Sequence, residues 1–467
     1  MNIDGPSCRR QRPAYLWAAR GKPFQHMTSS PDPVRRTAVQ LLTQVETGSR
    51  LESLLEVAAL ADARDRRFLR QLTAGVVKWR DRLDWILDSF SKRRVATLSA
   101  EIRQVLRLGA YQLLWLDRVP ERAAVHSAVE LAKEFEHTGT GGFVNAILRR
   151  VIAEGRNVSY PDRNADPEAY LAVFYSHPRW LVSRWLRRWD TPQVEALLRA
   201  NNEAAPLYVR AASGDESTPL PAGFAAEAVD GHPGALRVSR PEGLFEDHVF
   251  ASCWFAQDVS AGLAVRLLAP VAGDRVLDVC AAPGGKSAQL ATAVGAGSVT
   301  ATDISRQRLL RLRDNMRRLG LQQVRLIAED GEHPAGLGTF DRVLADVPCS
   351  GTGVFSRYAE ARWRKKPEDL SRHAERQFSI LEAAFERLRP GGTLVYSTCS
   401  LEEEENDAVV DRFLARRADA RLEAASLQFP DRPWATRAIQ TLPGRDPGDG
   451  AYAARLHRLP HGTARSA

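Results

Sequence analysis

Apolar residues recur at spacings of three and four along the first third of the chain, as Val34, Ala38 and Leu41 illustrate. The pattern covers residues 34–45, 65–90, 100–116, 123–135 and 142–152. Such spacing places apolar side chains on one face of a helix, and amphipathic helices with short connections form an all-α domain. The pattern therefore predicts a helical domain over residues 33–155. Residues 1–32 contain Arg and Pro and lack a long apolar stretch, so we interpret them as a disordered tail.

Short apolar runs alternate with helical patterns in the last part of the chain. The runs that predict strands are residues 275–279, 298–303, 324–328, 340–347 and 393–400. Strands separated by helices are typical of a parallel sheet with helical crossovers. Residues 251–467 are therefore predicted to form an α/β Rossmann-like domain. Residues 156–250 are richer in Pro and Gly and contain short β-like pieces, so we interpret them as a small α/β connecting subdomain.

Length and charge restrict the class of protein. The chain has 467 residues and is too long for one compact core, so several domains are expected. Lys and Arg number 65 against 57 Asp and Glu, which gives a formal net charge of +8. This excess permits binding of nucleic acid without requiring it. No apolar run approaches the length of a membrane-spanning helix and the histidines show no metal-ligand spacing, so we expect neither a membrane nor a metal.

The five cysteines of the chain are Cys8, Cys253, Cys280, Cys349 and Cys399, and no two form a Cys-x-x-Cys pair. An odd number at wide spacing indicates neither a disulfide framework nor a zinc site. Free thiols fit the reducing cytosol best, so we expect a cytoplasmic protein.

A glycine-rich turn, "VLDVCAAPGGKSAQLA", follows the first predicted strand of the α/β domain and opens a helix. Such a turn lets the backbone approach a nucleotide-like ligand at the carboxyl edge of the sheet. A P-loop would need glycine where Cys280 stands, and a dinucleotide site would need three spaced glycines where only Gly284 and Gly285 occur. S-adenosylmethionine, which has no phosphates, fits better. Asp303, at the end of the next strand, is placed to meet its ribose, although it could instead cap the helix starting near Ser305.

Cys349 and Cys399 each end a predicted strand, in "FDRVLADVPCSGTGV" and "GTLVYSTCSLEEEEN". In a doubly wound sheet these two strands are usually adjacent, about 5 Å apart, and functional groups gather outside their carboxyl ends. One cysteine there is more often packing than chemistry, but two at equivalent points are predicted to face one pocket. Glu402–Glu405 are predicted to lie in the first turn of the next helix and need not point into that pocket. Nearby cations such as Lys286 would favour a thiolate.

Several motifs resemble those of the RNA cytosine-C5 methyltransferases, namely "DVCAAPGGKSAQLA", "DVPCSGTGVF", "YSTCSLEEEEN" and "QDVSAGLAV". In the helical part, "LRLGAYQLLWLDRVPERAAVHSAVELAKEF" and "GFVNAILRR" resemble the NusB-like RNA-binding domain. The combination is similar to the Sun/RsmB (Fmu) subgroup, which methylates small-subunit ribosomal RNA. The likeness runs from about Val34 to Leu459. It implies an all-α NusB-like domain, a small α/β connecting subdomain and a Rossmann-like methyltransferase domain that uses S-adenosyl-L-methionine.

The resemblance also implies roles for single residues. In the family the cysteine of the Thr-Cys motif attacks C6 of cytosine and the cysteine of the Pro-Cys motif assists product release. Carried over by position, Cys399 is the nucleophile, Cys349 assists release, and Asp346 lies near the base and the cofactor. Contacts with the cofactor are implied for Cys280, Ala281, Ala282, Pro283, Gly284, Gly285, Lys286, Asp303, Asp330 and Asp346.

The basic segment "RYAEARWRKK" follows the Cys349 loop. We interpret it as an RNA contact surface that binds phosphates and stacks an extruded base, although a solvated face would have the same composition. The expected contact residues are Arg357, Arg362, Trp363, Arg364, Lys365 and Lys366. Departures from the family pattern, such as "GDGAYAARL" where "DGFF" is common, leave the target nucleotide open.

Three functions are compatible with these motifs. The first is methylation of cytosine C5 in 16S ribosomal RNA by a monomeric enzyme through a covalent cysteine adduct. The second is the same reaction on transfer RNA, because catalytic motifs do not encode the substrate's identity. The third is a non-catalytic RNA-binding or antitermination module, against which the two intact cysteine motifs argue.

Overall fold

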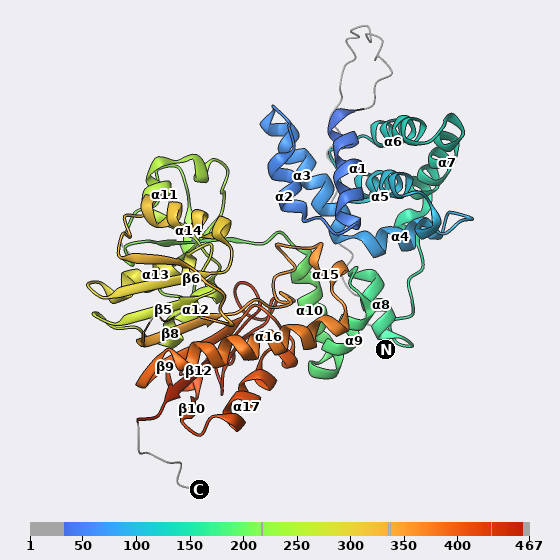
Figure 1. Cartoon of the computed structure of the whole chain (residues 1–467). Coiled ribbons are helices and arrows are strands. Elements are labelled where there is room, and N and C mark those ends of the chain that lie inside the picture. Colours follow the sequence, from blue (N-terminus) through green and yellow to red (C-terminus); the bar gives the residue numbers. More distant parts are fainter. Residues whose placement is uncertain (1–31, 216–217, 335, 337, 431, 461–467) are drawn as a thin grey trace, which may run out of the picture.

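The computed structural model describes residues 32–460 except 216–217, 335, 337 and 431, so nearly all of the predicted tail lies outside the described residues. Figure 1 shows a group of helices on one side of the molecule and a large sheet with its covering helices on the other. Helices α10 (Thr191–Asn202) and α15 (Ala361–Arg364) lie between the two parts. No helix in the described ranges is long and apolar enough to cross a membrane.

Seven α-helices form the predicted helical domain. They are α1 (Pro33–Glu46), α2 (Leu51–Val57), α3 (Ala63–Lys78), α4 (Arg80–Asp88), α5 (Ala100–Trp115), α6 (Glu121–Phe135) and α7 (Thr138–Glu154). The first helix begins where Asp32 accepts a hydrogen bond from the backbone of Arg35 and Pro33 occupies the first turn. The predicted stretch 65–90 is two helices, because the backbone leaves the helical conformation at Trp79. Helix α2 was not predicted, since only one of its residues, Leu51, is buried.

The connecting part combines four α-helices with a small antiparallel sheet. Its elements are α8 (Pro167–Phe174), α9 (Arg179–Arg188), α10, β1 (Leu207–Ala211), β2 (Ala226–Ala228), β3 (Ala235–Val238), α11 (His248–Cys253) and β4 (Trp254–Ala256), with strand order β2-β3-β1-β4. Because β4 pairs with β1, this sheet extends past the boundary expected at residue 250. Trp185 of α9 packs in one core with Phe355 and Leu401, which joins the connecting part to the large sheet.

The large sheet has strand order β10-β12-β9-β8-β5-β6-β7. Its strands are β5 (Arg275–Val279), β6 (Ser298–Asp303), β7 (Val324–Ala328), β8 (Phe340–Asp346), β9 (Leu388–Thr398), β10 (Ala420–Glu423) and β12 (Ala451–Arg458), and β11 (Ile439–Thr441) pairs with β12. All five predicted strands are present, and β5 to β9 pair in parallel as expected. The two C-terminal strands β10 and β12 add an antiparallel edge.

Helices cover both faces of this sheet. They are α12 (Val259–Leu268), α13 (Gly285–Val294), α14 (Arg306–Arg318), α16 (Pro367–Glu386) and α17 (Asp407–Arg416). Neighbouring residues of β8 face opposite layers: Val343 packs with Phe378 of α16, whereas Leu344 packs with Leu263 of α12. From β5 the chain continues outward to β6 and β7, and then returns to form β8 on the other side of β5. The carboxyl ends of β5 and β8 therefore mark the switch point where ligands bind in such sheets.

Candidate active site

The two cysteines predicted to face one pocket lie against each other. In the parallel pair of β8 and β9, Asp346 lies opposite Ser397. Cys349 follows Asp346 by three residues, and Cys399 follows Ser397 by two. The Sγ atoms of Cys349 and Cys399 are 3.2 Å apart. The adjacency of the two strands thus brings together thiols that are 50 residues apart in the chain.

The two thiols have different electrostatic environments. The hydrogen bond with Cys399 raises the pKa of the Cys349 thiol well above its usual range, and burial adds to the shift. Burial alone would lower the pKa of Lys286, but the carboxylate of Asp346 and, more weakly, Cys399 raise it overall. Cys349 therefore keeps its proton, while a permanent cation lies within electrostatic reach of Cys399.

Lys286 and Asp346 form an ion pair at the floor of the site. The Nζ of Lys286 donates to Asp346 at 2.7 Å, and the hydroxyl of Ser397 donates to the other carboxylate oxygen at 3.0 Å. Lys286 belongs to the glycine-rich turn, whereas Asp346 and Ser397 end neighbouring strands. These contacts fix the turn beside the thiols.

The glycine-rich turn fits a nucleoside-like ligand. Gly284 has φ +105°, and a Cβ there would lie 2.8 Å from Leu312, so only glycine suits the position. The turn lines a cavity of about 340 Å³; its lining includes Ala281, Ala282, Pro283, Gly285, Lys286 and Asp346. Burial raises the pKa of the Cys280 thiol, at the start of the turn, to about 12, so this cysteine stays uncharged.

Asp303, at the end of β6, has two backbone partners and an ion pair with Arg308 at 3.4 Å. One oxygen accepts from the backbone of Ser305 at 2.9 Å, but Ser305 itself caps α14, so Asp303 does not take the alternative capping role. The other accepts from the backbone of Ala282 at 3.3 Å and therefore faces the glycine-rich turn. Asp330 lies just beyond β7 at the same edge of the sheet, as its predicted cofactor contact requires.

Sequence reasoning missed Asp278, a buried carboxyl on β5. It accepts a hydrogen bond from the hydroxyl of Ser287 at 2.5 Å, and burial raises its pKa to about 7. The sequence does contain a signal for Asp278, because it lies inside the apolar run "VLDVC". A carboxyl in a buried strand needs a hydrogen-bond partner, which marks the position as unusual.

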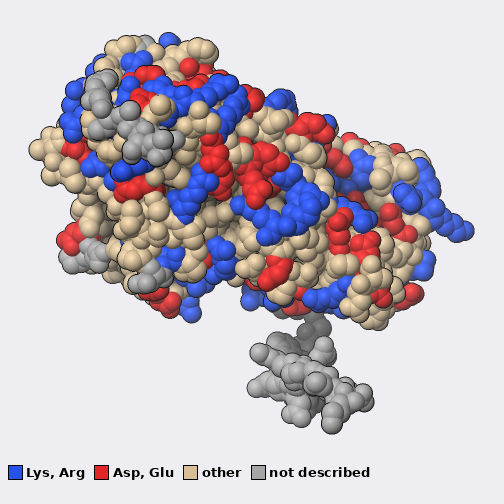
Figure 2. Space-filling model, turned by 90° about the horizontal axis from the view of Figure 1, so that it is seen from below, with Lys and Arg blue, Asp and Glu red and all other residues tan. Residues whose placement is uncertain are grey.

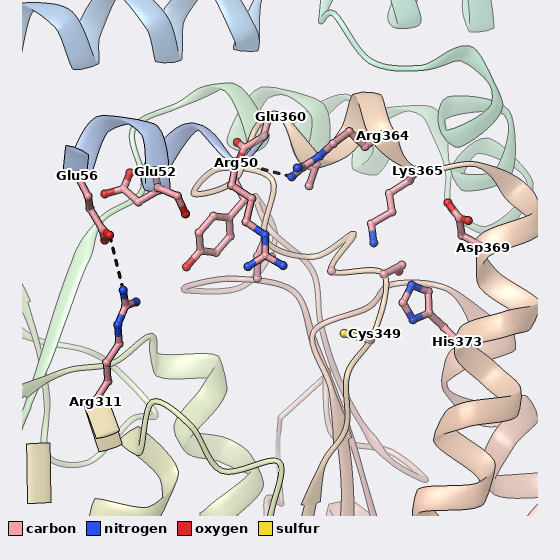
Figure 3. A pocket seen from close by; sticks show the side chains of 16 residues that line it. Arg50, Glu52, Glu56, Arg311, Cys349, Glu360, Arg364, Lys365, Asp369 and His373 are labelled. Atoms are coloured by element: carbon pink, nitrogen blue, oxygen red, sulfur yellow. Dashed lines mark ion pairs between the residues drawn. The ribbon is translucent and has the colours of Figure 1, made fainter. Parts of the chain in front are cut away.

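A second cavity, of about 600 Å³, opens over Cys349. Figure 3 shows Arg50, Lys365 and His373 pointing into the space around this cysteine. Arg50 precedes α2, so the helical domain supplies one wall of the cavity, and α16 with the preceding loop supplies another. Cations from two domains, together with carboxylates such as Glu360 and Asp369, thus line the cavity over Cys349.

The predicted RNA segment has a different role at two of its positions. Arg362 has 0% exposure and donates to the backbone carbonyls of Ser176 and Asn201, so its prediction as an RNA contact is wrong. Trp363 packs against the core of the helical domain, and the guanidinium of Arg80 lies 3.8 Å from its ring centre. Its ring is therefore not free to stack a base. These two residues hold the domains together.

Of the other residues of the segment, one forms ion pairs, two line the cavity over Cys349 and one is exposed. Arg357 pairs with Asp258 at 2.7 Å and with Asp449 at 2.6 Å. Arg364 and Lys365 line the cavity over Cys349, and the side chain of Lys366 is exposed. Tyr358, which was not singled out from the sequence, is 49% exposed and lines the same cavity. The sequence alone does not show that Tyr358, and not Trp363, is the exposed aromatic residue of this segment.

Replacing Trp363 with alanine is expected to lower the free energy of unfolding by about 3 kcal/mol, because it leaves a void between the domains. The change also removes the indole N–H of Trp363, which donates a 2.8 Å hydrogen bond to the carbonyl of Val77. Urea denaturation of the whole chain measures the effect. The exposed Lys366→Ala is the control, expected within about 0.5 kcal/mol of the unaltered protein. Equal stability of both variants would show that Trp363 does not join the domains.

The four glutamates after Cys399 also differ from their prediction. Glu403–Glu405 form a short 3₁₀ turn before α17, which begins at Asp407. Glu402 and Glu405 are buried, and only Glu403 and Glu404 face outward. Glu402 accepts from the side chains of Arg184 and Trp185 in the connecting part. The prediction that all four lie in the first turn of the next helix is therefore wrong.

The fold and the site define an S-adenosylmethionine-dependent RNA methyltransferase with an added helical domain. Residues 265–457 match the model of the 16S rRNA methyltransferase RsmB/F family, residues 32–153 match the NusB family, and residues 177–215 match the ferredoxin-like domain of RsmF/B-like methyltransferases. The chain belongs to the RsmB/F family. The predicted fold class and its NusB-like domain are confirmed.

Similar proteins cover almost the whole chain. Ribosomal RNA small subunit methyltransferase B of Klebsiella pneumoniae (strain 342) is 34% identical over 441 residues, which is 91% of this chain and 97% of the relative. The protein of the same name from Salmonella arizonae is 34% identical over 436 residues, covering 91% and 98%. The crystal structure of PH0851 shares the fold, with a TM-score of 0.74 at 22% identity over 91% of this chain and 98% of that chain.

Proposed function

We propose that the protein methylates C5 of a cytosine in 16S ribosomal RNA through a transient bond between Cys399 and C6 of the base. The observation that carries the proposal is the 3.2 Å separation of two sulfurs beside the glycine-rich turn. The name of the relatives, ribosomal RNA small subunit methyltransferase B, supports the substrate. The cytosol, where free thiols persist, is the proposed site of action.

The chemistry explains why a thiol is needed. C5 of a neutral cytosine is too weak a nucleophile to accept a methyl group from a sulfonium. Addition of the Cys399 thiolate at C6, with a proton or hydrogen bond at N3, moves electron density onto C5. S-adenosylmethionine, when bound, supplies the methyl group. C5 then gives its proton to solvent water, the electron pair of that C–H bond forms the C5–C6 double bond again, and the Cys399 sulfur leaves as a thiolate.

Different residues of the site have different roles in this reaction. Lys286 places a positive charge within electrostatic reach of Cys399 and pairs with Asp346, which it holds toward the reacting centre. Cys349 carries its proton 3.2 Å from the other sulfur and can pass it to that sulfur as the base departs. Asp303 and the glycine-rich turn would hold the cofactor at the carboxyl edge of the sheet, and Asp278 supports the turn from behind through Ser287.

The RNA contact is proposed for the cavity and not for a whole face of the molecule. Figure 2 shows Lys and Arg side chains mixed with Asp and Glu across the face in view, without one continuous basic surface. In the cavity, Arg50, Arg364 and Lys365 surround Cys349 and can meet phosphates, and Tyr358 offers an exposed ring.

Replacing Tyr358 with alanine is expected to raise KM for RNA about tenfold, because loss of one base–aromatic stack weakens binding by 1–3 kcal/mol. Steady-state methylation at varied RNA concentration measures the change. Tyr358→Phe is the matched control, since it keeps the ring and is expected to keep the KM. An alanine variant with unchanged KM would remove Tyr358 from the RNA site.

The substrate is tested by transfer of labelled methyl groups to total RNA from cells that lack the gene. Incorporation into 16S RNA, followed by mapping of 5-methylcytosine, is expected. Label in transfer RNA alone would replace the proposed substrate. Absence of label from all fractions would favour a non-catalytic RNA-binding module.

A further inference from the structure

Glu405 lies behind the two thiols with 0% exposure. Its Oε1 accepts hydrogen bonds from the backbone of Ser350 at 2.7 Å and from Nε2 of Gln377 at 2.9 Å. Its Oε2 accepts from the hydroxyl of Ser400 at 2.5 Å and from the hydroxyl of Ser350. One buried carboxylate thus collects four donors, as a charge in the interior must to offset desolvation.

These donors come from both cysteine loops. Ser350 directly follows Cys349, and Ser400 directly follows Cys399. Gln377 of α16 also donates to the carbonyl of Pro348 at 2.9 Å, so the chain is held on both sides of Cys349. Glu405 is therefore a shared anchor for the two strand ends, in addition to the backbone hydrogen bond that Gly353 donates to the carbonyl of Cys399 at 3.0 Å.

The contacts need a carboxylate in particular. A glutamine would have one acceptor oxygen and would present an N–H₂ group to donors already aimed at the second oxygen. At least one buried donor would then lose its acceptor, which costs far more than a lost exposed contact. The negative charge also lies within electrostatic reach of Cys349, where it adds to the forces that keep this thiol protonated.

We propose that Glu405 is a positioning residue that holds Cys349 and Cys399 at the separation required for attack and release. It reaches no reacting atom and acts only through the two serines and Gln377. The inference rests on the proposed covalent role of the thiols.

Glu405→Gln is expected to lower kcat about 100-fold with little change of KM for RNA, because misplacing a reactive group by about 1 Å costs that much. Glu402→Gln is the matched control. Glu402 is a buried carboxylate of the same segment, but its side chain bonds Arg184 and Trp185, and only its backbone N–H, which the substitution keeps, reaches Ser400. Glu405→Asp, which keeps the charge, is expected to recover part of kcat. Equal kcat in Glu405→Gln and Glu402→Gln would overturn the proposal.

A second readout needs neither RNA nor cofactor. The oxidant diamide takes one proton and one electron from each thiol, is reduced to its hydrazine, and leaves an S–S bond whose formation requires close sulfurs. Peptide mapping gives the rate of the Cys349–Cys399 crosslink, which is expected to fall at least about tenfold in Glu405→Gln and to stay unchanged in Glu402→Gln. If Glu405→Gln fails to fold, Ser350→Ala takes its place and is expected to slow the crosslink.

A crosslink at the rate of the unaltered protein in the folded variant would refute the positioning role. Failure of the unaltered protein to methylate RNA would instead refute the proposed function, and the crosslinking rate would still decide the role of Glu405.

Discussion

Replacing Cys399 with alanine is expected to reduce methyl transfer by at least about 10⁴-fold, because loss of a covalent nucleophile removes the reaction path itself. Without addition at C6, C5 of cytosine stays too electron-poor to take a methyl group. Binding of RNA and of cofactor is expected to persist, since Cys399 contributes little to either surface. Single-turnover assays with labelled S-adenosylmethionine measure the loss.

The control for this variant is Cys253→Ala. Cys253 ends α11 in the connecting part, among the described free thiols, and lies outside the proposed site. Its removal is expected to leave the rate within about twofold of the unaltered protein, as for most substitutions away from a site. If the Cys399 variant retained a rate near that of this control, the nucleophile would have to be another group.

Replacing Cys349 with alanine is expected to halt the reaction after attack. Cys399 can still add to C6, but the partner that contacts its sulfur and holds a proton is gone, so the base leaves slowly. A covalent protein–RNA adduct that survives denaturation is expected to accumulate. Turnover is expected to fall by about 100-fold or more, because loss of an acid–base group costs at least about that factor. Denaturing gel electrophoresis with labelled RNA detects the adduct.

The double variant Cys349→Ala, Cys399→Ala is the control, and it is expected to form no adduct. An adduct in the double variant would place the covalent bond elsewhere. A Cys349 variant that turns over at the normal rate without an adduct would refute its role in release.

The sequence predicted much of the architecture because the relevant signals are local. Each parallel strand of the large sheet is a short apolar run closed by polar residues, and β5 to β9 all occur where such runs stand. The adjacency of β8 and β9 followed from the usual order of doubly wound sheets, and it brought Cys349 and Cys399 together. Helix α2 has too few buried residues to produce a periodic pattern and was missed.

Errors arose where long-range contacts decide the environment of a charged residue. Arg362 stands in a run of cations that looks exposed, but its partners Ser176 and Asn201 are more than 150 positions away in the chain. Glu405 stands in a run of glutamates, and only the three-dimensional course of the 3₁₀ turn directs it inward. Charge alone does not reveal which member of a run is buried, because burial depends on donors supplied by other elements.

The site of covalent attachment tests the central claim most directly. The Cys349→Ala protein is incubated with 16S RNA and S-adenosylmethionine, and the trapped adduct is digested with nuclease and protease and analysed by mass spectrometry. We predict a methylated cytidine nucleotide bound to the sulfur of Cys399. A nucleotide on any other residue, or an unmodified Cys399 in a variant that still methylates its RNA, would contradict the proposed mechanism.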